Sequence, residues 1–214
     1  MNSKIRLLLL EVTGVFALIL IRIWIWRKNE VVIVAIVAAL ASWIFRKYSK
    51  KRLGIKPHAF SKRHLAAIVV ILFFAGKSVF TLYLLGTLTN PLLHFQANDV
   101  HALPKALGFY FGWAFFQQLW LNGYFAVNLK KLFRRLPHYR TLTYLAVGML
   151  FAIIHLPNPV LVITTLIGGS YSCYFFFRTR NLYILALAHA LIAIAIGYFL
   201  PTYLHHHLSI GPDF

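Results

Sequence analysis

Residues 64–86 read HLAAIVVILFFAGKSVFTLYLLG, a run of 23 residues in which Lys77 is the only charged side chain. About 20 apolar helical residues cross the roughly 30 Å core of a bilayer, so this run predicts a transmembrane helix. Of the 214 residues, 60% are hydrophobic and 12% are charged, whereas soluble domains have about 25% charged residues. Lipid must therefore be the solvent for much of the surface.

With six further apolar runs, the sequence predicts an all-α fold, a polytopic bundle of about seven transmembrane helices. The seven predicted spans are 7–26, 31–45, 64–86, 105–127, 141–155, 160–177 and 181–204. The first run follows Lys4 and Arg6 but lacks a small-residue cleavage site, so it is expected to be a retained helix. The fifth run ends in Leu156-Pro157-Asn158-Pro159, where proline prevents a helix from continuing. A helix that ends inside a membrane needs protein or water near its last carbonyls, so a polar pocket is predicted there.

The charge is strongly positive, with 22 Lys and Arg against 4 Asp and Glu. The basic residues gather in 46–63, 128–140 and 178–180, whereas 87–103 and 156–159 contain none. The positive-inside rule then places the N-terminus in the cytoplasm and the C-terminus outside the cell membrane, although Arg27 and Lys28 oppose this assignment. Because the charge lies in short segments between apolar runs, it predicts contact with the lipid bilayer and no binding of nucleic acid.

The chain is expected to form effectively one domain. Residues 1–63 would make an N-terminal transmembrane hairpin with a basic cytoplasmic loop, and residues 64–214 would make the core. A single cysteine, Cys173, excludes an intrachain disulfide and a zinc site with several cysteines.

Five polar side chains interrupt the apolar runs of this core and are the candidate site residues: Gln117, Gln118, Asn122, His155 and His189. At 1.5 Å per residue, Gln117, His155 and His189 lie roughly 16, 21 and 12 Å below the cytoplasmic ends of their helices. Asn122 follows Gln118 by four residues and so lies on the same helical face. Such residues either hydrogen-bond between helices or line a functional site, and their common depth favours one shared site.

The order of these residues resembles the CAAX-protease and bacteriocin-processing family of intramembrane proteases, called CPBP or ABI. Its motifs EExxxR, FxxxH and HxxxN/D correspond to Gln117-Gln118-x-x-x-Asn122, Phe151-x-x-x-His155 and His189-x-x-x-Ala193, within residues 105–200. The Leu-Pro-Asn-Pro sequence after His155 and the Gly168-Gly169 pair also fit. The resemblance implies a CAAX-protease-like core in the last four spans and a membrane-embedded or lipidated peptide as substrate or client.

This chain departs from the family pattern at the positions of the family's catalytic and supporting residues. In the family that the chain resembles, the first glutamate is expected to activate water, and the second glutamate and the arginine to support that geometry. The histidines are expected to polarise the scissile carbonyl. Here glutamine, glutamine and asparagine stand in place of the acids and the arginine, and Ala193 replaces the last polar residue. An amide can orient water but cannot deprotonate it, and loss of a general base costs about 10²–10⁴-fold in rate.

Two functions therefore stay open: an intramembrane endopeptidase in which His155 or His189 replaces the missing base, and a non-catalytic protein that holds a client peptide or helix in the same cavity. A transporter is disfavoured, because the apolar runs contain no carboxylate relay and no paired broken helices. No cofactor and no metal are expected. His155 and His189 have no carboxylate or thiolate nearby to complete a set of metal ligands. His205-His206-His207 lies at the outer end of the last run and is expected to be a solvated cluster.

Overall fold

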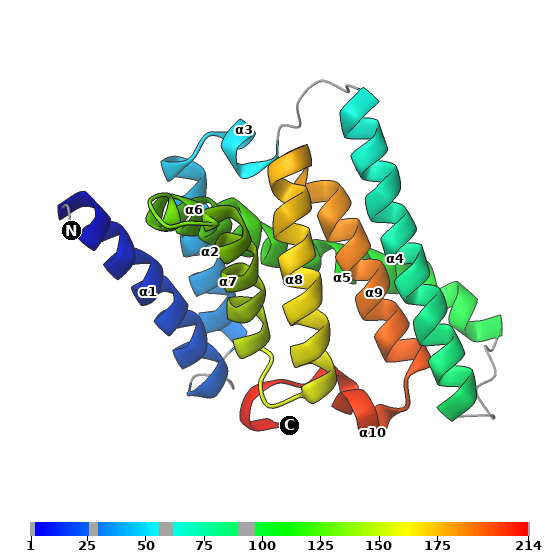
Figure 1. Cartoon of the computed structure of the whole chain (residues 1–214). Coiled ribbons are helices and arrows are strands. Elements are labelled where there is room, and N and C mark those ends of the chain that lie inside the picture. The colour runs from blue at the N-terminus through cyan, green and yellow to red at the C-terminus, as the bar shows by residue number, and fades with distance from the viewer. Residues whose placement is uncertain (1–2, 26–29, 56–61, 90–96, 214) are drawn as a thin grey trace.

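The computed structural model describes residues 3–25, 30–55, 62–89 and 97–213, and no strand occurs in them. They form a bundle of helices (Figure 1). Its elements are α1 (Ser3–Trp24), α2 (Glu30–Lys47), α3 (Lys50–Leu53), α4 (Lys62–Thr89), α5 (Ala97–Gln118), η1 (Leu119–Ala126), α6 (Val127–Phe133), α7 (Tyr139–Ile153), α8 (Pro159–Thr179), α9 (Leu182–Phe199), α10 (Thr202–His205), η2 (His206–Leu208) and η3 (Gly211–Asp213). The all-α prediction is confirmed.

Four helices of the described part are long and apolar enough to cross a membrane: Ser3–Trp24, Leu65–Leu88, Pro159–Thr179 and Leu182–Phe199. Large apolar side chains on their outer faces are exposed, for example Phe73 at 64% and Leu88 at 79% on α4. Water would penalise such faces and lipid would not, so these helices are compatible with a multi-pass membrane protein. Seven spans remain a prediction, and the basic-free loop at 87–103 lies partly outside the described residues.

The predicted span 105–127 is part of a longer helical rod. Gln118 and Val127, which flank η1, both have right-handed helical backbone angles, so α5, η1 and α6 run on without a break from Ala97 to Phe133. The segment η1 has π-helical hydrogen bonding, and all but one of its eight residues are buried. Short π-helical segments in α-helices are frequent at functional sites, because they shift the register of the side chains that follow.

Proline ends the helix before the predicted pocket, as the sequence indicated, and asparagine side chains cap the helices that follow. Helix α7 ends at Ile153, before Pro157, and α8 begins at Pro159, where a missing backbone N–H costs nothing. The Asn158 side chain caps α8 by accepting a hydrogen bond of 3.2 Å from the backbone of Leu161. Asn181 caps α9 in the same way, over 3.1 Å to the Tyr183 backbone.

Helices α7 and α8 lie against each other, as α9 does against α4 and α5. The α7–α8 contact is close because glycines meet there: a Cβ on Gly169 would lie 3.0 Å from Gly148 Cα. In Figure 1, α3 and the C-terminal end of α8 lie at one end of the bundle, and the C-terminus of the chain lies at the other. The basic segments 46–55 and 178–180 therefore share one end, as a common membrane face requires.

Candidate functional site

The five candidate residues come from three parts of the bundle. Gln117 and Gln118 end α5, and Asn122 lies in the middle of η1. His155 lies two residues after the end of α7, and His189 lies in the middle of α9. Gln118, Asn122 and His155 are buried, whereas Gln117 and His189 are partly buried.

Three of these residues form one hydrogen-bonded chain between helices. Asn122 Nδ2 donates to Gln118 Oε1, and the Gln118 Nε2 atom lies 3.3 Å from His189 Nδ1. Asn122 Nδ2 also donates to Ser172 Oγ over 3.1 Å, and that hydroxyl donates to the Gly169 carbonyl over 3.0 Å. The Gln118 amide nitrogen can only donate, so His189 Nδ1 accepts and its proton is on Nε2. The chain of contacts is neutral throughout.

His155 is held separately, by its own helix. Its Nδ1 lies 2.7 Å from the Phe151 carbonyl oxygen, which can only accept, so Nδ1 carries the proton and Nε2 keeps a lone pair. The Phe151 ring meets the imidazole of His155 edge-on at 4.7 Å between ring centres, and meets His189 at 5.5 Å. Phe151 therefore contacts both histidine rings edge-on.

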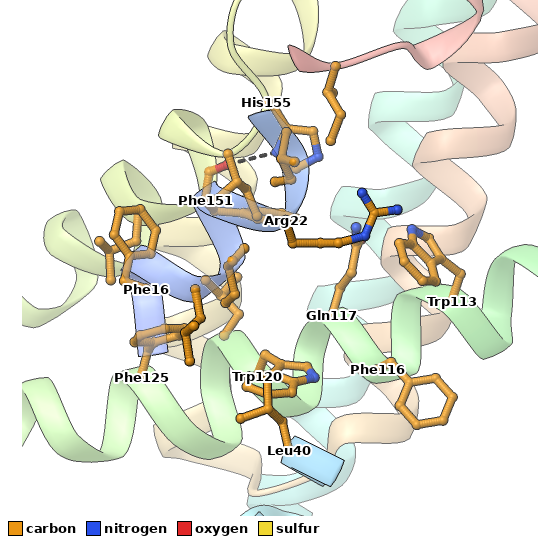
Figure 2. Close-up of a pocket in the computed structure, with 17 residues that line it drawn as sticks. Phe16, Arg22, Leu40, Trp113, Phe116, Gln117, Trp120, Phe125, Phe151 and His155 are labelled. Atoms are coloured by element: carbon orange, nitrogen blue, oxygen red, sulfur yellow. Dashed lines mark hydrogen bonds between the residues drawn. The ribbon is translucent and has the colours of Figure 1, made fainter. Parts of the chain in front are cut away.

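A cavity of about 350 Å³ lies beside these groups, between α1, α5–η1 and α7 (Figure 2). Of its 17 described lining residues, 14 are apolar, and the three polar ones are Arg22, Gln117 and His155. Gln118, Asn122 and His189 are not among the lining residues. The candidate residues thus form two groups, a cavity pair (Gln117 and His155) and a buried network (Gln118, Asn122 and His189), and Phe151 contacts a histidine of each group.

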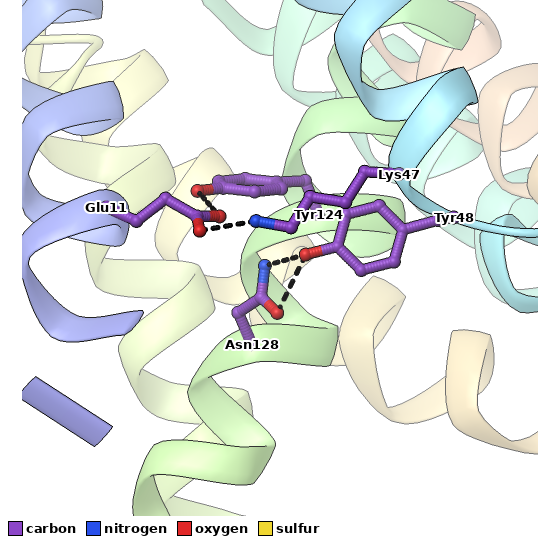
Figure 3. Close-up of polar contacts among 5 residues, drawn as sticks. All are labelled: Glu11, Lys47, Tyr48, Tyr124 and Asn128. Atoms are coloured by element: carbon purple, nitrogen blue, oxygen red, sulfur yellow. Dashed lines mark hydrogen bonds and ion pairs between the residues drawn. The ribbon is translucent and has the colours of Figure 1, made fainter. Parts of the chain in front are cut away.

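None of the described lining residues is acidic. Glu11, a carboxylate inside the first predicted span, is held elsewhere: it accepts a hydrogen bond of 2.9 Å from Tyr124 Oη and pairs with Lys47 (Figure 3). Beside this pair, Tyr48 and Asn128 exchange hydrogen bonds of 2.8–3.0 Å. Glu11 therefore fastens α1 to α2 and η1. The side chains of the other acidic residues, Glu30, Asp99 and Asp213, lie outside the described set.

No group of three or more potential metal ligands occurs among the described side chains. His155 and His189 each have one ring nitrogen engaged, with Phe151 and Gln118 respectively, and His205 lies outside the described side chains. Lys77 lies exposed on α4 and does not line the cavity.

Sequence reasoning missed two members of the site. Arg22 reaches into the cavity from α1 (Figure 2), although its charge inside an apolar run was a signal of function. Ser172 joins the buried network from α8 but has no sequence signal, because serine is common between membrane helices.

Chemically, the cavity offers one lone pair on His155 Nε2, the amide of Gln117 and the cation of Arg22, among apolar walls. It can accept a hydrogen bond at His155, donate or accept at Gln117, and attract a negative group at Arg22. Comparisons of the chain with models of protein families, with curated proteins and with solved structures found no match.

Proposed function

We propose that this chain is a seven-span protein of the cell membrane whose cavity binds a membrane-embedded or lipidated peptide without hydrolysing it, as a degenerate relative of the CAAX-protease-like membrane proteases. The observation that carries the proposal is the composition of the cavity: Gln117 and His155 face it together, and no acidic side chain lines it among the described residues. The order of the sequence motifs between residues 105 and 200 supports the family and the core in the last four spans.

The walls of the cavity support an apolar or lipid-bearing ligand. Lining by 14 apolar residues out of 17 favours an acyl chain or an apolar peptide side chain, and a few polar groups would fix its orientation. Gln117 can donate to a peptide carbonyl and accept from a peptide N–H, which is the pattern that a buried backbone needs in a membrane.

The amides argue for binding rather than hydrolysis. Gln117 can hold a water or a carbonyl but cannot take a proton from water at neutral pH, so the usual glutamate mechanism loses about 10²–10⁴-fold. The buried network around Gln118 is neutral and contains no unpaired charge, as expected of a site adapted to work without carboxylates.

Hydrolysis with His155 as the base is a second candidate, and one observation favours it. The Phe151 carbonyl fixes the proton of His155 on Nδ1, which leaves Nε2 able to accept a proton from a water placed by Gln117. This mechanism would leave Arg22 as the remaining group to stabilise an oxyanion.

The proposed orientation has the N-terminus in the cytoplasm and the C-terminus outside. Basic residues at 46–55 and 178–180 lie at the end of the bundle opposite the C-terminus (Figure 1), which supports this direction. The cavity then opens toward the outer half of the membrane, because His155 and Arg22 lie near the ends of α7 and α1 that are distant from the basic segments.

Binding can be measured with a cysteine placed in the cavity. In a Cys173→Ala background, Trp120→Cys would be labelled by an apolar maleimide in liposomes that also contain a library of hydrophobic and acylated peptides. Ligands are expected to slow labelling of Trp120→Cys but not of Phe73→Cys, which lies exposed on α4. Equal labelling rates with and without every peptide would contradict the binding proposal.

Turnover is tested in parallel with fluorogenic versions of the same peptides. We expect no cleavage by the unmodified chain and a gain of cleavage in Gln117→Glu that is lost again when His155→Ala is added. Cleavage by the unmodified chain that disappears in His155→Ala would instead establish the second candidate.

A further inference from the structure

Two aromatic rings at the basic end of the bundle gather cations from separate parts of the chain. Lys130 Nζ and Arg180 Cζ lie 4.3 and 4.9 Å from the centre of the Phe177 ring, which puts these two cations at most 9.2 Å apart. Arg52 and Lys131 lie 4.9 and 5.9 Å from the centre of the Tyr48 ring, at most 10.8 Å apart. Attraction to the ring faces partly offsets the repulsion within each pair.

Backbone contacts hold the two pairs in place and next to each other. The Arg180 guanidinium donates a hydrogen bond of 3.2 Å to the Arg52 carbonyl, and the Leu182 backbone N–H donates over 3.0 Å to the Gly54 carbonyl. Gly54 has φ +78° and lies so close to the Phe176 ring that a Cβ there would approach it to 2.8 Å. The turn between α8 and α9 is therefore packed tightly on α3, and the cations are organised before any ligand binds.

Among the side chains that the structure describes, no carboxylate forms an ion pair with Lys130, Arg180, Arg52 or Lys131. Glu11 pairs with Lys47, which lies 5.8 Å from the Tyr48 ring centre at the edge of the cluster. The other three acids belong to distant segments: Glu30 begins α2, 17 residues before Lys47, while Asp99 lies in the first turn of α5 and Asp213 in η3. The pKa of Lys130 is lowered by burial and by Arg180, and that of Lys131 by burial and by Arg52. A bound anion would relieve the repulsion in both pairs.

We propose that Lys130 and Arg180, with Arg52 and Lys131 beside them, bind the phosphate of an anionic phospholipid in the membrane leaflet that faces the basic segments. One phosphate with hydrogen bonds of about 2.8 Å on both sides spans roughly 8 Å between two cations, which fits the limit of 9.2 Å at Phe177. Arg180 follows the last residue of α8, Thr179, so it lies at the level where a spanning helix meets lipid headgroups. The long side chains cover aromatic rings while their charges face the headgroups.

The choice of a lipid over a soluble phosphate compound rests on this position at the helix ends. Exposed apolar residues of α8, such as Ile163, Ile167 and Tyr171, show that the exposed surface of this helix below the level of Arg180 is apolar, as contact with acyl chains requires. A single site of this kind would also anchor the turn between α8 and α9. The proposal is independent of what the cavity binds.

The test compares lipid retention by the full chain in native mass spectrometry from nanodiscs that contain equal amounts of phosphatidylglycerol and phosphatidylcholine. The unmodified chain is expected to retain one phosphatidylglycerol preferentially. Lys130→Gln with Arg180→Gln should lower that preference at least tenfold, because two charge-assisted hydrogen bonds are lost. Arg134→Gln with Arg135→Gln removes the same charge at exposed positions nearby and should change the preference less than twofold.

The charge-conserving pair Lys130→Arg with Arg180→Lys guards against misfolding, and it should keep most of the preference. Equal losses in both Gln double variants would mean a diffuse electrostatic effect and would overturn the proposal, as would an unmodified chain without preference for the anionic lipid. Complete displacement of the lipid by millimolar inorganic phosphate would identify a soluble phosphate compound as the ligand and would also overturn it.

Discussion

Glu11 fastens one wall of the cavity, so its removal should both destabilise the protein and open the cavity. Five of the 17 described lining residues come from α1, from Phe16 to Ile23. Glu11 lies about one and a half turns before Phe16 on that helix, and it joins α1 to Tyr124 in η1 and to Lys47 in α2. The perturbation to test is Glu11→Ala.

The two contacts of Glu11 should contribute unequally. Tyr124 is fully buried, so its hydroxyl would lose its hydrogen-bond acceptor at a cost of about 1–3 kcal/mol. The side chains of Lys47 and Glu11 are 35% and 25% exposed, and ion pairs of this kind contribute about 0.2–1 kcal/mol. Glu11→Ala should therefore cost about 2–3 kcal/mol, Lys47→Met about 1 or less, and Glu11→Gln an intermediate amount because it still accepts from Tyr124.

Reversible unfolding in mixed detergent micelles would measure these free energies, and labelling of Trp120→Cys in a Cys173→Ala background would measure cavity access. We expect Glu11→Ala to raise the labelling rate at least threefold, while Lys47→Met leaves it nearly unchanged. A loss of stability in Lys47→Met as large as in Glu11→Ala would show that the ion pair dominates, and the reasoning from burial would be refuted.

Three further predictions concern packing, charge and topology. Gly148→Ala should lower the free energy of unfolding by about 1–3 kcal/mol, because its Cβ would lie 2.2 Å from a side-chain oxygen of α8 and 2.4 Å from a carbonyl. Gly168→Ala is the control in the same unfolding assay. Its Cβ would have nothing within 4 Å, so it should be tolerated. Asn122→Arg alone should lower the free energy of unfolding by about 3–5 kcal/mol, because it buries an unpaired cation. Adding Gln118→Glu should recover part of that loss, since the two side chains are in contact. Purely additive effects in the double variant would refute an interaction between the two positions. A cysteine at His94→Cys should react with an impermeant maleimide only from outside intact cells, and reaction only from the cytoplasmic side would reverse the proposed orientation.

The sequence predicted the helical class and the helix end before Pro157, because each depends on local chemistry. Long apolar runs leave few alternatives to helices in lipid, and Pro157 and Asn158 end one helix and begin the next. The caps at Asn158 and Asn181 were not predicted and come from the structure. The same reasoning divided the chain into separate runs and did not anticipate the rod from α5 through η1 to α6, because π-helical hydrogen bonding has no simple sequence signal.

The partners of polar residues were harder to predict than their positions. Glu11 is the one acidic residue in the first apolar run, and its partners Tyr124 and Lys47 are 113 and 36 residues away in the sequence. Arg22 stands as a charge in the first apolar run, and only the fold shows that it lines the cavity. Such contacts depend on which faces of helices meet, and a single sequence does not determine this.

Helix geometry explains why the two adjacent glutamines do different work. Neighbouring residues on a helix point about 100° apart, so Gln117 and Gln118 cannot both face one cavity. Gln117 lines the cavity, and Gln118 turns toward His189 on α9, with Asn122 one turn later on the same face. A carboxylate at position 117 would be able to act on a ligand in the cavity, whereas one at 118 would instead charge the buried network and draw a proton onto His189 Nδ1. Gain of cleavage in Gln117→Glu therefore tests the chemistry of the cavity itself, and Gln118→Glu is its matched control, with the same change of charge one residue away and no expected gain.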